Sequence, residues 1–176
     1  MQATETETQA ECIKVKLLFE NWRQYLDEVE DFDDFADTPE KIEKNLQYYY
    51  REHAPNKGKR KDLGEWKNNQ LVVFILPEDN RFFFVVSEND EPLAYIAVAP
   101  FRESYSVGNM SKKPGEKSFY QTEFYEKVME VLGKGSLYSD SKQTTGGKGL
   151  WDRFSNKEKV PTEEDGEGKW RWRLTL

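Results

Sequence analysis

The sequence of 176 residues predicts an α+β domain with a mostly antiparallel central sheet of about six strands, flanked by helices on both faces. Residues 70–101 hold three apolar runs, and the breaks between them are short and rich in turn-forming residues. Short turns force neighbouring strands to pair antiparallel. The runs are nearly continuous rather than alternating, which indicates a sheet covered on both faces. Segments before and after the runs have the spacing of amphipathic helices, which would supply this cover.

The chain before residue 70 contains a polar start, one strand and two helices. Residues 1–11 have nothing to bury, so we expect a flexible polar tail there and a single domain over residues 12–176. Residues 12–19, CIKVKLLF, alternate like a half-buried strand that passes into a helix near Phe19. Thr38 and Pro39 then suit the N-cap and first position of a second helix, which we expect to end at about Glu52.

Two charged segments flank this second helix. Residues 27–37 are acidic, but a calcium loop there lacks the required glycine and final glutamate, so we interpret the segment as a solvated face. Residues 57–61 hold four cations in five positions. We interpret them as a mobile basic loop that balances the acidic segment, rather than as a nucleic-acid patch.

The chain after residue 101 predicts a helix with clear ends and several short elements. Ser118 is the expected N-cap of the helix, and Gly133 follows it as the glycine that ends it. Residues 102–117 are expected to be a polar stretch with a short strand around residues 105–107. The remaining elements are a short strand at 136–139, a short helix from 144 or 145 to 154, a charged loop, and a terminal strand over the alternating KWRWRLTL.

Composition excludes several classes of function. The net charge of −7 and a pI near 5.0 disfavour general nucleic-acid binding. The single Cys12 and single His53 exclude an intramolecular disulfide and a metal site rich in these residues, so no metal is expected. The sequence contains neither a signal-like stretch nor an apolar run long enough to cross a membrane, which predicts a cytoplasmic protein without membrane contact. Serine-hydrolase and P-loop motifs fail on spacing.

The order of the predicted elements resembles the GCN5-related N-acetyltransferase fold, in which a central sheet is splayed to admit acetyl-CoA. The stretch FFFVVSENDEPLAYIAVAP resembles the central hairpin of that family, and SLYSDSKQTTGGKGLWDRF resembles its late strand and short helix. Together they cover roughly residues 71–154. The polar, aromatic-rich chain looks like a divergent phage-type member of the family, and a phage-encoded member is a candidate virion component.

The resemblance implies acetyl-CoA as cofactor and a set of residues that would bind it. In the family, one central strand presents its backbone to the cofactor, and a loop that opens a helix holds the pyrophosphate on backbone N–H groups. The glycine spacing of this loop departs from the family pattern, and a solvated loop is the alternative interpretation of its lysines. The corresponding positions here are Ala97 and Val98 in the strand, and Gly108, Lys112, Lys113, Gly115, Lys117 and Ser118 in the loop.

The resemblance also implies catalytic groups and leaves two main hypotheses. The tyrosine that serves as general acid in the family falls at Trp151, which cannot replace it, so Tyr138 is the substitute, with Ser139 as the alternative. The general base would come from Glu88, Asp90, Glu91 or Glu103, of which Glu91 and Glu103 are the preferred candidates, provided that burial raises the pKa. The first hypothesis is an N-acyltransferase that transfers an acetyl group from acetyl-CoA to an amine. The second is a catalytically degenerate protein with a structural or protein-interaction role, which meets a protein partner through an acidic or aromatic surface. A weaker third is that the acidic segment mimics nucleic acid.

Overall fold

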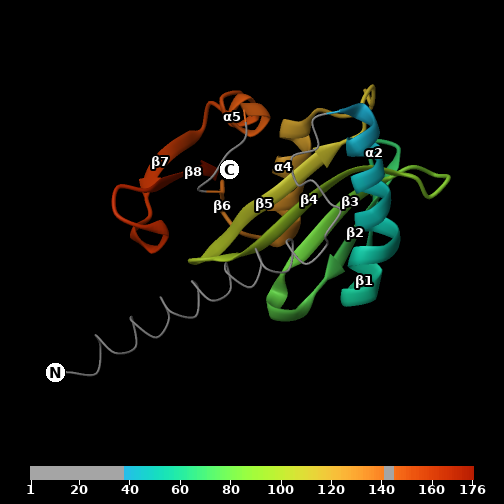
Figure 1. The fold of residues 1–176 in the computed structure, drawn as a ribbon, viewed down its shortest axis with the longest axis horizontal. Coiled ribbons are helices and arrows are strands. Elements are labelled where there is room, and N and C mark those ends of the chain that lie inside the picture. The colour runs from blue at the N-terminus through green and yellow to red at the C-terminus, as the bar shows by residue number, and fades with distance from the viewer. Residues whose placement is uncertain (1–37, 141–144) are drawn as a thin grey trace.

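The computed structural model describes residues 38–140 and 145–176, which form one sheet with helices packed against it (Figure 1). The predicted tail, the strand at residues 12–19 and the acidic segment at 27–37 lie outside the described residues. The helical elements are α2 (Pro39–Tyr48), the π-helical turn η1 (Tyr49–His53), α3 (Ala54–Lys57), α4 (Gln121–Leu132) and α5 (Thr145–Trp151), with the short 3-10 turns η2 (Pro77–Asp79) and η3 (Glu163–Asp165). The strands are β1 (Lys59–Trp66), β2 (Asn69–Ile75), β3 (Arg81–Val86), β4 (Pro92–Phe101), β5 (Ser104–Lys112), β6 (Ser136–Tyr138), β7 (Lys157–Pro161) and β8 (Trp170–Thr175).

The strands form a single mixed sheet of eight, in the order β1-β2-β3-β4-β5-β6-β8-β7. All neighbours pair antiparallel except β5 and β6, which are parallel. The expected sheet of about six mostly antiparallel strands flanked by helices on both faces is therefore wrong. The three apolar runs did predict β2, β3 and β4, and their antiparallel pairing is confirmed.

The strands that the sequence did not predict are polar. β1 begins within the segment interpreted as a basic loop, and most of its residues are exposed. β5 occupies most of the stretch expected to be a polar loop, and β7 lies in the expected charged loop. These segments become strands because a neighbour offers a ladder of hydrogen bonds, so their own hydrophobic pattern carries little signal.

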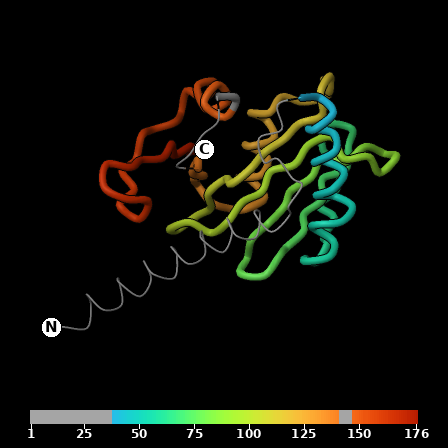
Figure 2. The backbone as a smooth tube through the Cα atoms, viewed as in Figure 1, coloured from blue at the N-terminus to red at the C-terminus, as the bar shows by residue number. Residues whose placement is uncertain are grey.

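The helices cover the sheet unevenly. Side chains of α2, η1 and α3 pack on one face against residues of β2, β3 and β4, and this apolar cluster includes no described residue of β5, β6 or β8. On the other face, a larger cluster joins α4 and α5 to residues of β2 to β6 and β8. Figure 2 shows that the chain from α5 onward extends away from the part of the sheet that lies beside α2.

α2 starts where the second predicted helix was expected to start, and the helical segment continues beyond the predicted end at Glu52. Thr38 Oγ1 accepts a hydrogen bond from the backbone N–H of Lys41 at 3.3 Å, and Pro39 occupies the first helical position. Beyond Tyr48 the helix widens into η1, in which Tyr49, Tyr50 and His53 are all buried. The wider π turn places these three side chains toward the sheet, and the helix then continues to Lys57.

Gly58 joins this helix to β1 at a point of close backbone contact. A Cβ atom at this position would lie 2.9 Å from the carbonyl oxygen of Ile75 and 2.8 Å from the side chain of Leu76. We expect Gly58→Ala to lower the free energy of unfolding by about 1–3 kcal/mol, because backbone must shift to admit the methyl group. Urea denaturation measures the change. Gly135→Ala is the matched control, since no atom lies within 4 Å of its Cβ position; equal losses in both variants would contradict the steric explanation.

The boundaries of α4 agree in part with expectation. Gly133 has φ 63° and ends the helix in the left-handed conformation, as predicted. The helix starts at Gln121 with Tyr120 as N-cap, so the prediction of Ser118 as the cap is wrong. The backbone N–H of Tyr120 donates to the carboxylate of Glu123 at 2.8 Å, which closes the first turn in place of a serine cap.

Candidate functional site

The junction between β5 and β6 is the point at which the sheet changes from antiparallel to parallel pairing. The two strands are paired at a single position, Ser106 opposite Tyr138. Just beyond it, Ala97 of β4 lies opposite Asn109 and Val98 opposite Val107, so Gly108 is a bulge without a partner on β4. After this bulge β5 continues to Lys112 beside β4, and no described strand pairs with that half of its other edge.

The three residues predicted to be catalytic lie at two separate places. Glu91 precedes β4 and forms an ion pair with Lys113, whereas Glu103 follows β4 and accepts a hydrogen bond from the Tyr138 hydroxyl at 2.8 Å. β4 is 10 residues long. A strand of that length separates its two ends by about 33 Å. The structure therefore brings Tyr138 and Glu103 together and leaves Glu91 at the far end of the strand.

The environment of Glu103 does not favour a general base. Its backbone N–H, and then the hydroxyl of Tyr138, hydrogen-bond to the carboxylate and hold the pKa of Glu103 below its ordinary value. The guanidinium groups of Arg102 and Arg173 lower this pKa further. Because a general base needs a pKa near the working pH, this carboxylate is a weak proton acceptor.

The two strand residues predicted to meet the cofactor are enclosed. Ala97 and Val98 are completely buried in the middle of β4. β4 has β3 on one side and β5 on the other, and both residues are paired with both neighbours. Their backbone groups therefore face other strands.

Part of the predicted phosphate loop is strand, since Gly108 and Lys112 belong to β5, and the rest of it leads to the start of α4. Lys112 Nζ donates to the carbonyl oxygen of Phe119 at 2.6 Å and lies 4.9 Å from the centre of its ring. Burial lowers the pKa of Lys112. Lys113 is held by Glu91, whose hydrogen bond raises the pKa of the lysine, and by Glu43 at 3.4 Å. These two cations thus already have protein partners.

Two carboxylates accept backbone hydrogen bonds in the same loop. Glu116 accepts from the N–H of Ser118 at 2.7 Å, and Glu123 accepts from the N–H of Tyr120 at 2.8 Å. Hydrogen bonds to Ser118 and to Lys67 lower the pKa of Glu116 and of Glu123, respectively, so both groups are ionised near neutral pH. Gly115, at φ 79°, makes the turn that precedes them, and Lys117 lies between Glu116 and Ser118. The two carboxylates therefore already occupy the backbone N–H groups of Ser118 and Tyr120.

Aromatic side chains contribute to the apolar cluster on the α4 face of the sheet. Phe119, Phe124 and Trp151 belong to one continuous apolar cluster that also includes Leu137 of β6 and Leu174 of β8. Phe124 is completely buried and Trp151 is 3% exposed. Tyr120 is 75% exposed and lies outside this cluster.

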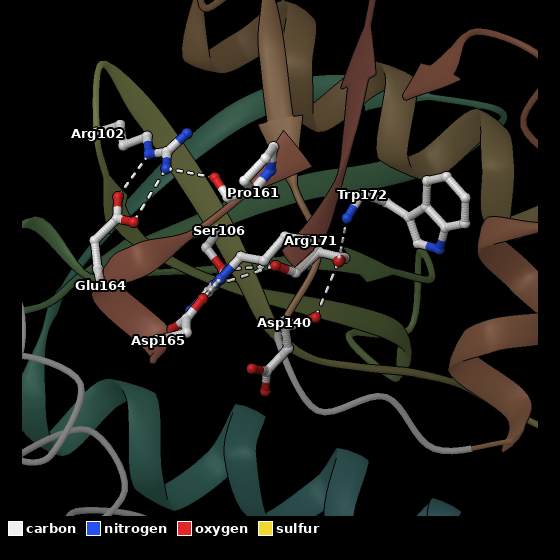
Figure 3. A network of polar contacts seen from close by, with 9 residues as sticks. Arg102, Ser106, Asp140, Pro161, Glu164, Asp165, Arg171 and Trp172 are labelled. Carbon is white, nitrogen blue, oxygen red and sulfur yellow. Dashed lines mark hydrogen bonds and ion pairs between the residues drawn. The ribbon is translucent and has the colours of Figure 1, made fainter. Parts of the chain in front are cut away.

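A buried polar network holds the opposite side of the junction, and sequence analysis did not identify it (Figure 3). Arg171 of β8 is 1% exposed, and its guanidinium donates to both carboxylate oxygens of Asp165 at 2.6 Å. It also donates to the Ser106 hydroxyl at 2.6 Å and to the carbonyl oxygen of Ser139 at 3.2 Å. The guanidinium carbon lies 4.3 Å from the ring centre of Phe101. One side chain therefore joins β4, β5, the residue after β6, β8 and η3.

A second, more exposed arginine adds to this connection. Arg102, in the turn between β4 and β5, donates to both carboxylate oxygens of Glu164, at 2.6 and 3.0 Å, and to the carbonyl oxygen of Pro161. The alternation of Arg171 with Trp170 and Trp172 on a strand is typical of a charged side chain that faces solvent, so the sequence gave no signal that Arg171 is buried.

Neither a metal site nor a membrane span is found in the described part of the chain. Across residues 38–140 and 145–176, no group of three or more His, Cys, Asp or Glu side chains could hold a metal ion. None of the helices in these ranges combines the length and apolar character that crossing a bilayer requires. In comparisons with known proteins, the chain matches no family model and no curated sequence.

Proposed function

We propose that this chain is a protein-binding domain that resembles an acyltransferase but does not transfer acyl groups. The observation that carries the proposal is the pair of carboxylates at the opening of α4. The family of acyltransferases that the sequence resembles binds pyrophosphate on backbone N–H groups at this place. Here Glu116 and Glu123 accept hydrogen bonds from two backbone N–H groups, so these groups are already occupied where a phosphate would need them.

The catalytic groups support the same conclusion. Glu91 is paired with Lys113, and Glu103 is held ionised by its hydrogen bonds. Phe124 and Trp151 are buried in the apolar cluster that joins α4 and α5 to the sheet. A chain whose described residues supply neither a suitable base nor unoccupied N–H groups for a phosphate at these places is suited to binding another protein.

Calorimetric titration with acetyl-CoA, followed by a free-thiol assay with simple amines, tests the proposal. We expect no binding tighter than about 1 mM and no release of thiol. Glu116→Ala/Glu123→Ala frees the two N–H groups and removes two negative charges, so it shows whether these carboxylates cause the lack of binding. Clear binding of acetyl-CoA by the unmodified chain, together with turnover, would overturn the proposal.

The second candidate function is an acetyl-CoA-dependent N-acyltransferase. The Gly108 bulge and the single pair between β5 and β6 favour it, because a ligand with amide groups can pair with an unoccupied strand edge. In this function Tyr138 would be the general acid, since it already touches Glu103. The titration described above separates the two functions, because only the enzyme binds and consumes the cofactor.

A further inference from the structure

β1 is an outer edge of the sheet and carries a run of positive charge. It is the first strand in the order and pairs only with β2 among the described strands. Lys57, Lys59, Arg60 and Lys61 are all exposed. The chain as a whole has a net charge of −7, so this patch has the opposite sign to the molecule.

The cations of β1 are divided between the two faces of the sheet. Lys59 lies opposite Ile75 and Lys61 opposite Val73, so both share one face, whereas Arg60 lies on the other. Arg60 is already held, since it donates to Asp62 at 2.9 Å and to the Tyr50 hydroxyl at 3.0 Å. Within the part of the chain that the structure describes, neither Lys59 nor Lys61 has an ion pair. These two lysines therefore present charge that the protein itself does not neutralise there.

The opposite edge of the sheet, β7, shows a different arrangement. Lys157 has an ion pair with Asp152 at 3.5 Å, and Glu158 has one with Arg173. Lys159 lies 4.1 Å from the ring centre of Trp170, and Pro161 closes the strand. Alternating charges and proline protect an edge against any added strand. The acidic residues of β1, Asp62 and Glu65, lie on the same face as Arg60, so the face with Lys59 and Lys61 carries charge of one sign. Such a face repels basic strands and further copies of itself but attracts acidic strands.

We propose that the β1 edge binds an extended acidic segment of a partner protein by strand addition. This inference rests on the proposed protein-binding function and names its site and the chemistry of its partner. The backbone of the segment would continue the sheet, and acidic side chains at every second position would lie opposite Lys59 and Lys61.

The test uses the full chain and a short capped peptide in which Glu alternates with Val. We expect calorimetry to detect binding that weakens steeply with added salt. Lys59→Gln/Lys61→Gln should weaken binding about tenfold, because two cross-strand charge pairs are lost. Lys148→Gln/Lys169→Gln removes the same charge from two other exposed lysines and should leave binding unchanged. A peptide methylated on alternate backbone nitrogens should lose binding, since it keeps its side chains but cannot complete the ladder.

Three results would overturn the inference. One is the absence of peptide binding to the unmodified chain. This includes the case in which the peptide binds only to the variant Asp33→Asn/Asp34→Asn, because the chain's own acidic segment would then occupy the β1 edge. Another is binding that is equal in the two lysine variants. The last is binding that survives backbone methylation. Each of these leaves the proposed function standing, whereas acetyl-CoA turnover overturns that function whatever the peptide does.

Discussion

Asp165→Ala is expected to lower the free energy of unfolding by about 3 kcal/mol, because it leaves a buried arginine without its carboxylate partner. Asp165 accepts two hydrogen bonds from Arg171, whose side chain is 1% exposed, and is itself 14% exposed. Removing one partner of a buried ion pair costs more than the pair contributes, since the remaining charge has lost its hydration. Breaking a buried ion pair in this way costs about 3–5 kcal/mol, and the lower end of this range applies because water can reach the position of Asp165. Urea denaturation at neutral pH measures the loss.

A double variant separates this explanation from a simple loss of packing. Arg171→Met/Asp165→Leu removes both charges and keeps apolar volume, so we expect it to be more stable than Asp165→Ala alone. Ser106→Ala, which removes one neutral acceptor of Arg171, should cost about 1 kcal/mol. If Asp165→Ala and Ser106→Ala were equally mild, the network would not be holding the two parts of the sheet together.

The sequence predicted the centre of the sheet better than its edges. β2, β3 and β4 are apolar on both faces, and hydrophobic runs separated by turn residues have few other interpretations. β1 and β7 are edge strands whose exposed charges protect them from aggregation, and those charges give them the appearance of loops. The parallel pairing of β5 and β6 depends on α4, which returns the chain to the same end of the sheet, and no local pattern encodes it.

The candidate site was predicted in part. Tyr138 and Glu103 were selected separately and do meet, because β6 pairs beside the start of β5. The sequence could not show that Glu116 and Glu123 would turn their carboxylates onto backbone N–H groups, since the same residues on an extended loop would face water. It also gave no sign that Arg171 would be buried, because its partners lie in three other segments of the chain.

His53 should make the protein sensitive to mild acid. It is 3% exposed, and its ring lies 5.2 Å from Tyr49, 5.4 Å from Phe82 and 5.8 Å from Tyr48. Burial, with a smaller contribution from the charge of Lys57, lowers the pKa of His53 to about 4. The unfolded chain takes up the proton near pH 6.5 and the folded chain only near 4, so stability falls as pH drops through this window. Between pH 7 and 4.5 we expect a loss of about 2–3 kcal/mol from this group.

The chain offers a clean measurement of this effect because His53 is its single histidine. Carboxyl groups with lowered pKa values also lower the stability as pH falls through and below their ordinary pKa values, but they contribute equally to the unmodified chain and to a variant without the histidine; they are Asp79, Asp90, Glu103, Glu116, Glu123 and Glu164. Urea denaturation at several pH values, for the unmodified chain and for His53→Phe, gives the comparison. Phenylalanine keeps an aromatic ring against Phe82 and cannot be protonated, so the variant should lose most of the slope between pH 6.5 and 4.5. An equal slope in both proteins would show that other groups cause the acid sensitivity and that protonation of His53 does not disturb the packing of α2 and η1 on the sheet.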